Sequence, residues 1–525
     1  MNITLPPTFT PLASFLKEKM LQTQDATCLL EPVVFDVHSI EVLHTIMSLL
    51  KEAQEKEHKV FIAGDYDADG LCSTAMMVTL CKTLNLNVGY YIPHRIKEGY
   101  GLKKDIASQA LFKGYDLFIC VDNGVSAFDA IELIKSSHKK VIVIDHHTIT
   151  SPIEVDALLH PQHLDPVYAA MCTSGLVYLL ALALNQDSDF MIQLAGCATI
   201  ADMMPLHHFN RFLVVKAIES MNKAMITPFA LLLKKQSVNE EELSFQLIPK
   251  INAIGRMSEL ANANTMVNYL LSNDITAMIQ YATQVESINE QRKTLTKSMA
   301  LQALEHVSDS NGFLFIVSDD FHEGIVGLIA NQIMRLKQTN VFVGVKKDDS
   351  IKGSMRSTNV HLVDLFQPYQ HLLMHFGGHG KAAGMEVAHE HFDTLKAHIL
   401  EDMKHITPLS DESNVIEVDP SLITLEGVIE FERCRPFGIG WEKPTLLIKG
   451  VKIKTITPLK GGMSKAMVFT RNGLLDIFAF DPDFASLQPN QMIDIEGTLG
   501  INTYMGSKSI QFTLSAFKAC QDDTN

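Results

Sequence analysis

The sequence lacks the features that define several protein classes. Its eight cysteines are scattered without a CxxC pair, so neither a zinc site nor a disulfide framework is supported, and buried free thiols are expected. The longest apolar runs, such as Leu176–Leu184, are too short to cross a bilayer. The N-terminus has no basic region followed by an apolar one. We therefore expect a soluble, cytoplasmic protein.

The chain has fewer basic than acidic residues, 44 Lys and Arg against 60 Asp and Glu. The net charge of −16 taken alone argues against a nucleic-acid partner, because phosphate binding usually requires a basic surface. The stretch 443–471 is an exception, since it contains seven basic residues and no Asp or Glu. No internal repeat or low-complexity tract is present, and 525 residues suffice for about three domains. A local basic face on an acidic protein is therefore compatible with the sequence.

The most informative stretch is FIAGDYDADG at 61–70, which places three carboxylates at alternate positions after a short apolar run. In an extended segment, side chains two residues apart face the same way, so Asp65 and Asp67 can converge on one point. Such carboxylates repel each other unless a proton or a cation lies between them, and Mg²⁺ or Mn²⁺ fits. An acidic surface turn is the simpler alternative. A calcium loop is excluded, because its twelfth position would be Met76 instead of Glu.

Further polar groups follow other predicted buried strands. Leu117–Val121 ends at Asp122, and Val141–Ile144 ends at Asp145-His146-His147. Apolar strands that alternate with helical segments predict a parallel sheet covered by helices, in which ligands bind beyond the carboxyl ends of the strands. Asp202 follows a helix-like segment, so we expect it at the same crevice.

The pattern predicts an α/β fold with a second α/β unit and a β-rich end. The helical spacing at 274–307, without Gly or Pro, predicts one long helix that bridges two domains. Five short alternating runs after residue 446 favour a small barrel of the oligonucleotide-binding (OB) kind. The expected units are an N-terminal lead-in and helix (1–57), a parallel-sheet domain (58–273), the bridging helix (274–307), a second α/β domain (308–406) with a glycine-rich loop at 376–384, and a barrel (412–520). The stretch 245–257 reads as a loop.

Five side chains form the candidate chemical site: Asp65, Asp67, Asp122, His146 and Asp202. Carboxylates and an imidazole in one crevice can hold two divalent cations, with one carboxylate between them, and so support phosphoester hydrolysis. Each residue has a simpler explanation, as a turn residue, a helix cap or a surface histidine. Their joint occurrence at several strand and helix ends favours the two-metal interpretation.

The motifs that carry these residues resemble those of the DHH phosphoesterase superfamily. GDYDADG, VDNG, IDHHT and ATIADMMPL match its successive motifs. YYIPHRIKEGYGL, PKINAIGRM, HEGIVGLIA, KGSMRS, FGGHGKAAG and RPFGIGWEKP extend the match to the RecJ-like single-stranded-DNA exonucleases, over about 40–517. The resemblance implies a DHH domain, a DHH-associated domain and an OB-like domain. It implies hydrolysis of single-stranded DNA from the 5′ end to mononucleotides, with Mn²⁺ or Mg²⁺, in DNA repair and recombination.

The same resemblance implies individual roles. Asp65 would hold one metal ion, Asp67, His146 and Asp202 the other, and Asp122 would bridge them. His147 would lie beside the scissile phosphate. Asp69 would orient a ligand or, as nearly good an alternative, cap the following helix.

A 5′-end enzyme also needs a pocket for a terminal phosphate, for which guanidinium groups are suited. The candidates are Arg95, Ser354 and Arg356, with ordinary surface pairing as the alternative for the arginines. Tyr100 would stack on a base or simply pack in its turn. The remaining candidates for contacts with the DNA backbone are Asn252, Arg256, His379, Lys443, Lys452 and Lys454.

Three positions depart from the family pattern: Met355, Trp441 and Lys250. None is a proposed metal ligand. Two other functions stay open at this point. One is a DHH phosphoesterase for small substrates, which generally lacks the barrel and the long helix, and the other is a non-catalytic scaffold, which would have lost metal ligands. The resemblance alone implies single-strand-binding protein or a helicase as partners, and a monomer is the default state.

Overall fold

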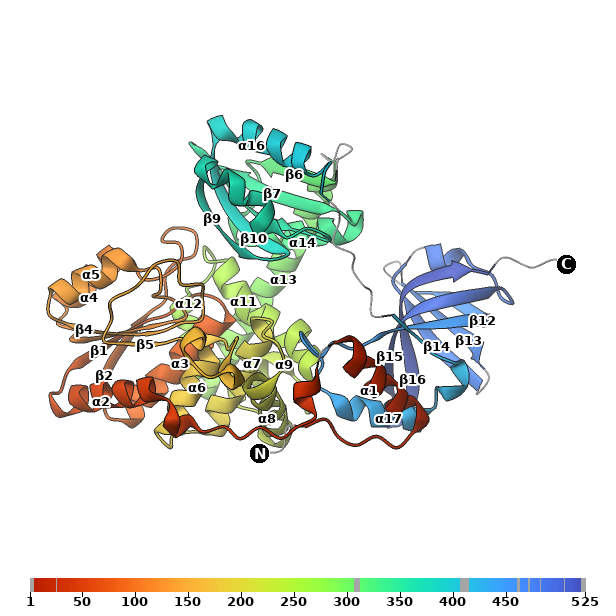
Figure 1. The fold of residues 1–525 in the computed structure, drawn as a ribbon, viewed down its shortest axis with the longest axis horizontal. Helices are drawn as coiled ribbons and strands as arrows, with labels where there is room; N and C mark the ends of the chain where they lie inside the picture. Colours follow the sequence, from red (N-terminus) through yellow and green to blue (C-terminus); the bar gives the residue numbers. More distant parts are fainter. Residues whose placement is uncertain are drawn as a thin grey trace.

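The computed structural model describes residues 4–24, 26–305, 312–406, 415–459, 463–470, 473–481, 483–504 and 506–520. Figure 1 shows three lobes, each built on one β-sheet: the first sheet lies at the left, the second at the top and the third at the right. Among the described residues, no helix is both long and apolar enough to span a membrane.

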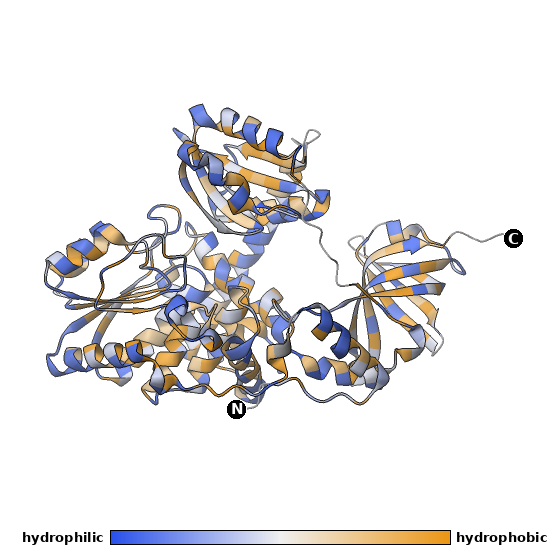
Figure 2. Ribbon diagram, in the orientation of Figure 1, coloured by the Kyte–Doolittle hydropathy of each residue, from blue (hydrophilic) through white to orange (hydrophobic). Residues whose placement is uncertain are grey.

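The first sheet is parallel throughout, which confirms the prediction. Its strand order is β2-β1-β3-β4-β5. The chain steps from β1 outward to β2 and then returns to the other side of β1 as β3, so the topology reverses between β1 and β3, where open α/β sheets bind ligands. All five residues of β3 are buried, and the strands of this sheet are largely hydrophobic in Figure 2. The strands are β1 (Lys59–Ala63), β2 (Asn87–Tyr91), β3 (Leu117–Val121), β4 (Lys140–Ile144) and β5 (Ala157–Leu159).

Helices cover this sheet and extend it into an all-helical part. α3 begins directly after the acidic stretch and is buried along most of its length. The helices are α2 (Glu41–Glu55), α3 (Ala68–Thr83), α4 (Lys104–Phe112), α5 (Phe128–Ser136), α6 (Thr173–Ala183), α7 (Asp189–Ala201), α8 (His208–Ala224), α9 (Thr227–Leu233), α10 (Glu240–Glu242), α11 (Ile248–Arg256) and α12 (Ala263–Leu271).

Two stretches differ from the sequence-based expectation. The stretch 245–257 was expected to be a loop, but it is helical, with a π-helix η5 (Leu243–Leu247) that continues into α11. Pro249 lies in the first turn of α11, where its missing N–H costs no helical hydrogen bond.

The glycine-rich stretch 376–384 was also expected to be a loop. It forms most of the hairpin β9 (Leu373–His379) and β10 (Ala382–Ala388), because both segments pair backbone to backbone.

The long bridging helix is present as α13 (Ile275–Glu305), which packs against α9, α11 and α14. It connects the first lobe to the second sheet, whose order is β6-β7-β8-β10-β9 with only β6 and β7 parallel. The remaining elements of this lobe are β6 (Phe313–Ser318), α14 (Val326–Lys337), β7 (Asn340–Lys346), β8 (Ser350–Arg356), α15 (Leu362–Phe366) and α16 (His389–Asp402).

The third sheet closes into the predicted barrel, because β12 pairs with both β13 and β15. The N-terminal helix α1 (Pro11–Thr23) shares the barrel's hydrophobic core through Leu12, Leu16 and Met20. The strands are β11 (Val415–Glu417), β12 (Thr445–Pro458), β13 (Ser464–Thr470), β14 (Gly473–Ala479), β15 (Met492–Tyr504) and β16 (Ser507–Ala519), with helix α17 (Leu425–Phe431) beside them.

Charged side chains join the barrel lobe to the first lobe. Arg211 of α8 is buried and donates to the backbone oxygens of Cys434 and Pro436, both at 3.0 Å. Arg435 forms ion pairs with Glu240 and Glu241 at the start of the helical run that leads to α11. The barrel is therefore attached by buried, hydrogen-bonded charges, which leave little freedom at this contact.

Candidate metal centre

The first carboxylate, Asp65, follows β1 and is 2% exposed. Its Oδ1 has no hydrogen-bond partner in the part of the chain that the structure describes. Burial, followed by the charge of Asp67, raises the pKa of Asp65 well above its ordinary value. The turn is tight: a Cβ on Gly70 would lie 2.6 Å from the backbone oxygen of Asp65. The sequence thus places the buried carboxylate of Asp65 at the end of β1, with one oxygen that has no hydrogen-bond partner among the described residues.

Asp67 and Asp69 lie at the start of α3 and have different partners. Asp67 is the N-cap, and its Oδ1 accepts from the Gly70 N–H at 3.0 Å. Asp69 does not cap this helix, contrary to one of our two expectations. Its carboxylate instead accepts the backbone N–H groups of Thr173 and Ser174, at 2.7 and 2.8 Å, at the beginning of α6. Asp69 therefore ties α3 to α6 directly behind the site.

Asp122 follows β3 in the left-handed region, with φ of +62°. Its neighbour Asn123 fixes this turn, because its amide donates to the backbone oxygens of Ala63 and Val121 and so links the ends of β1 and β3. Thr173 Oγ1 donates to Asp122 Oδ1 at 3.1 Å. Burial, followed by the surrounding carboxylates, raises the pKa of Asp122 well above its ordinary value.

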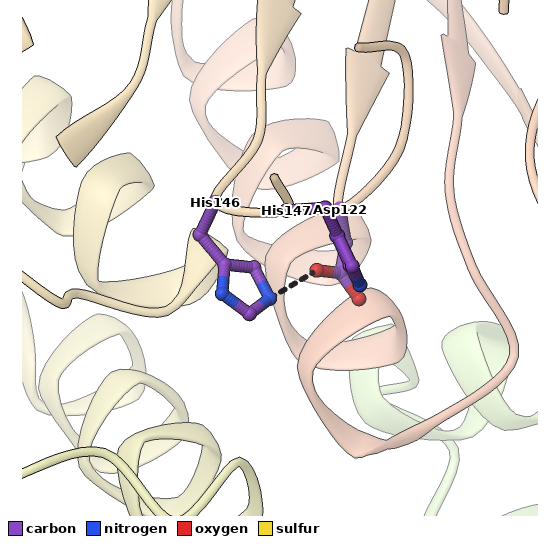
Figure 3. Close-up of side chains that lie close together, drawn as sticks. All are labelled: Asp122, His146 and His147. Atoms are coloured by element: carbon purple, nitrogen blue, oxygen red, sulfur yellow. Dashed lines mark ion pairs between the residues drawn. The ribbon is translucent and has the colours of Figure 1, made fainter. Parts of the chain in front are cut away.

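His146 and His147 come from the loop after β4, and Figure 3 shows a ring nitrogen of His146 pointing toward the Asp122 carboxylate. His146 Nε2 lies 3.3 Å from Asp122 Oδ1 and 3.2 Å from Asp202 Oδ2. Burial lowers the pKa of His146, but the hydrogen bond to Asp202 and the nearby carboxylates outweigh it and raise the pKa to about 9. Asp202 caps the end of α7, and burial raises its pKa to about 7.

Among the described residues, the ligand atoms form three overlapping groups that share Asp122, and the atoms of each group lie within 4.8 Å of one another. Two groups contain all the carboxylates: Asp65, Asp67 and Asp122 in one, and Asp69, Asp122, His146 and Asp202 in the other. The third, Asp122, His146 and His147, overlaps the second and adds only His147. In this grouping Asp67 lies with Asp65 and Asp69 lies with His146 and Asp202, whereas the resemblance implied Asp67 as a ligand beside His146 and Asp202; the role of each residue stays a prediction. The reason for the grouping is that α3 starts at Ala68, so Asp67 and Asp69 leave the backbone in different directions.

The donor set fits two hard divalent cations. Burial and the neighbouring carboxylates raise the pKa values of Asp65, Asp122 and Asp202, and the carboxylates alone raise that of His146. Bound cations would relieve this crowding of negative charge. The unused Oδ1 of Asp65 is an oxygen ligand without a partner among the described residues. Carboxylates with one imidazole suit Mn²⁺ as well as Mg²⁺.

Asp145 is a residue of the candidate site to which the sequence reasoning gave no role. It is fully buried, and its Oδ1 lies 2.8 Å from His147 Nδ1. Burial raises its pKa, but the bonds from His147 and from the Val125 N–H bring the pKa below its ordinary value, so Asp145 is ionised. Tyr100 Oη lies 2.9 Å from the same Nδ1 and donates to the Asp122 backbone oxygen. Both groups orient His147 and leave its Nε2 available; the acid that directly precedes the two histidines was the available signal.

The candidate phosphate ligands come from two lobes. Arg95 stacks on the Tyr66 ring at 4.8 Å, and Arg356 lies at the end of β8. A Cβ on Gly327 would lie 3.2 Å from Arg356 Nη2 and 3.4 Å from Ser354 Oγ, so both side chains lie over the first turn of α14. Burial, followed by the charges of other arginines including Arg95, lowers the pKa of Arg256 to about 9. The sequence-predicted residues are therefore brought together around one region.

Two other candidate DNA-binding residues, Asn252 and Lys443, make contacts within the protein that hold its elements together. The Asn252 side-chain oxygen accepts the Ala68 N–H at 2.8 Å and thereby binds the start of α3 to α11. Lys443 Nζ lies 3.0 Å from Glu432 at the junction of the barrel with the first lobe. The side chain of His379 lies outside the described residues.

Lys452 and Lys454 are exposed on β12 of the barrel, as a DNA-facing role requires. The sequence reasoning missed their neighbour Phe469, which is 46% exposed on β13 and pairs in register with Lys452. Lys454 Nζ lies 5.8 Å from the centre of the Phe469 ring. An exposed aromatic ring among lysines matches the stacking and phosphate contacts of single-strand binding. Two further basic residues of the predicted stretch, Lys460 and Arg471, lie outside the described residues.

The three departures from the family pattern have structural explanations. Met355 is fully buried in the core of the second lobe. Trp441 is fully buried in the barrel core, and its ring N–H donates to the Cys434 backbone oxygen at 3.0 Å. Lys250 pairs with Glu286 at 3.0 Å and so attaches α11 to α13.

Comparisons with known proteins agree with this architecture. The DHH family N-terminal domain matches residues 59–202, the DHHA1 domain matches 310–405 and the RecJ OB domain matches 416–516. The Bacillus subtilis single-stranded-DNA-specific exonuclease RecJ is 28% identical over 517 residues, which cover 94% of this chain and 65% of that protein. The Haemophilus influenzae protein of the same name is 26% identical over 518 residues, which cover 89% of this chain and 88% of the relative.

Two solved structures are similar in fold. The crystal structure of RecJ in complex with Mn²⁺ from Thermus thermophilus has a TM-score of 0.80 at 22% identity and covers 99% of this chain and 79% of that one. A crystal structure of exonuclease RecJ bound to manganese has a TM-score of 0.59 at 28% identity. The match covers 70% of this chain and 95% of that one.

The first lobe, a parallel sheet with acids and histidines at its strand ends, matches the DHH family N-terminal domain, and the second lobe matches the DHHA1 domain. The barrel matches the RecJ OB domain. Over most of its length the chain is similar to the single-stranded-DNA-specific exonucleases RecJ.

Proposed function

We propose that the protein is a metal-dependent exonuclease that hydrolyses single-stranded DNA from its 5′ end to mononucleotides. The observation that carries the proposal is the pair of ligand groups that share Asp122. Asp65, Asp67 and Asp122 would hold one divalent cation, and Asp69, Asp122, His146 and Asp202 the other. When bound, two such cations polarise a phosphoryl oxygen and activate water for in-line attack.

The chain's own residues supply orientation and proton handling. Asp145 and Tyr100 hold His147 through Nδ1, so Nε2 is the ring nitrogen that can face the scissile phosphate or the leaving oxygen. Asp69, through its two bonds to α6, keeps the second ligand group in place. Arg95, Ser354 and Arg356 would bind the 5′ phosphate and so set the polarity of the reaction.

The barrel favours a long single strand over a small phosphodiester as the substrate. Lys452, Lys454 and Phe469 form an exposed surface suited to phosphates and bases. A small phosphodiester bound at the metal centre would not contact this surface. A non-catalytic scaffold is less well supported, because the chain retains two full ligand groups. Action in the cytoplasm in DNA repair and recombination, with single-strand-binding protein or a helicase as partners, belongs to the same proposal.

Digestion of a long single strand labelled at either end tests the proposal, in Mn²⁺ and in EDTA. We expect mononucleotides from the 5′ end with the wild type and with Asp105→Ala, a matched control that removes an exposed carboxylate of α4. Asp122→Ala and EDTA should both abolish cleavage. Cleavage of dinucleotides but not of long strands would instead favour the small-substrate function, and binding without any cleavage would favour the scaffold.

A further inference from the structure

Phe245 is a large aromatic residue on the protein surface that the function described so far does not use. It is 76% exposed, although water disfavours an exposed phenylalanine ring. It lies in the middle of the π-helix η5, where the backbone departs from regular α-helical geometry. Departures of this kind are frequent at functional sites, so Phe245 is a candidate for contact with a ligand.

The helical run of α10, η5 and α11 brings one of its faces to the metal centre, and Phe245 lies on that face. Asn252 and Arg256 follow Phe245 by seven and eleven positions, which is close to two and three helical turns. Asn252 accepts the Ala68 N–H at 2.8 Å, directly after the candidate ligand segment 65–67. At about 1.5 Å per residue, Phe245 lies about 10 Å from Asn252 along this face.

The other end of the run meets the barrel lobe. Glu240 accepts the backbone N–H of Phe437, a residue of the barrel core, at 2.8 Å. Glu240 and Glu241 are both paired with Arg435, so their charges do not stand unopposed beside a DNA strand. In Figure 1, α7 and α9, which pack against η5, lie between the first sheet and the barrel. Phe245 therefore lies between the metal centre and the barrel.

Two further apolar side chains are exposed where segments of the metal centre and of the barrel lobe meet. Met203, which is 68% exposed, directly follows Asp202, and Ile439, which is 39% exposed, precedes β12. The two segments are joined, because the Leu206 N–H donates to the Ile439 backbone oxygen at 2.7 Å. The surface here thus offers apolar contacts, which suit bases better than phosphates.

We propose that Phe245 stacks on a base of the single strand between the barrel and the metal centre. A strand that occupies both places has to pass between them, where the ring lies. Stacking on a π face is independent of base identity, so it suits movement along a strand of any sequence. A stacked strand rises about 3.4 Å per nucleotide, so a ring about 10 Å from Asn252 meets a base about three nucleotides from the metal centre. This inference rests on the proposed function, because it describes the path of that substrate.

Binding without cleavage tests the stacking. Single strands labelled at the 3′ end, either intact or with one abasic nucleotide at each position in turn near the 5′ end, are titrated with protein in EDTA and followed by fluorescence anisotropy. In the wild type, an abasic nucleotide about three positions from the 5′ end should weaken binding about tenfold. Phe245→Ala should weaken binding of the intact strand about tenfold. The same abasic nucleotide should then have little further effect, because the ring and the base act as a pair.

Two variants serve as controls. Phe245→Tyr keeps an aromatic ring and should retain the effect of the abasic nucleotide. Phe112→Ala removes a ring that is 95% exposed on α4 and should bind every strand as the wild type does.

The outcomes are distinct. Unchanged binding in Phe245→Ala would overturn the proposal and leave the ring free for a protein partner. An abasic effect in Phe245→Ala as large as in the wild type would also overturn it, since ring and base would then act independently. If Phe245→Ala shows no cooperative thermal unfolding, an undiminished abasic effect in Phe245→Leu, which is apolar but not aromatic, overturns it instead. Failure of the proposed function would be seen separately, as absence of cleavage by wild-type protein in Mn²⁺, because the binding assay requires no cleavage.

Discussion

The titrating groups of the metal centre predict how stability depends on pH when divalent cations are removed. Burial, followed by the charge of Asp69, raises the pKa of Asp202 from 3.8 to about 7, and the pKa of its partner His146 rises from 6.5 to about 9. Both groups therefore bind protons more tightly in the folded than in the unfolded protein. By linkage, the stability that they contribute is fully present below about pH 4 and is lost as the pH rises to about 9.

The magnitude follows from the shift on Asp202. About three pKa units at 1.36 kcal/mol each correspond to a loss on the order of 4 kcal/mol. The shift on His146 is not added, because the two groups titrate as a pair at 3.2 Å. For a domain of about 200 residues this corresponds to a fall in Tm of roughly 10 °C.

Thermal unfolding between pH 4 and pH 9 measures this effect, in EDTA and in Mn²⁺. In EDTA, Tm should fall with pH in the wild type and in Asp105→Asn, and the fall should be smaller in Asp202→Asn. In Mn²⁺ the trend should weaken or reverse, because the cation binds the deprotonated ligands. A Tm that rises with pH in EDTA, or an undiminished fall in Asp202→Asn, would refute the reasoning.

Three further variants test individual contacts. Tyr100→Phe removes the hydroxyl that contacts His147 Nδ1 and should lower kcat about tenfold with KM unchanged. Tyr90→Phe, which loses a hydroxyl bonded to Asn268, should not lower kcat, and equal effects of the two variants would contradict the proposed role of His147. Phe469→Ala should weaken single-strand binding in a filter or anisotropy assay by about 1–3 kcal/mol, and Phe112→Ala, on a helix of the first lobe and 95% exposed, should leave it unchanged. Gly324→Ala should lower nuclease activity at least about tenfold while far-UV circular dichroism stays unchanged, because the added methyl group forces the two lobes apart; full activity would show that this close contact is dispensable.

Local alternation in the acidic stretch was a good guide to its geometry. The argument that residues two apart in an extended segment face the same way predicted that Asp65 and Asp67 converge, and the two side chains do lie in one ligand group. The family resemblance assigned Asp67 to the other group. The grouping of ligand atoms agrees with the argument from the residues, and which cation each carboxylate holds stays a prediction.

The sequence by itself determined most strands of the parallel sheet, the long helix and the barrel, because hydrophobic periodicity and turn residues are local signals. The short edge strand β5 was not expected. It also determined which residue types stand at the strand ends. Only the tertiary structure decided that Asp69 binds the start of α6 and that Asp145 holds His147. It alone placed α1 in the core of the barrel, which lies at the opposite end of the chain. Most of these contacts join segments that are distant in sequence, so no local pattern encodes them; they follow from how the lobes pack.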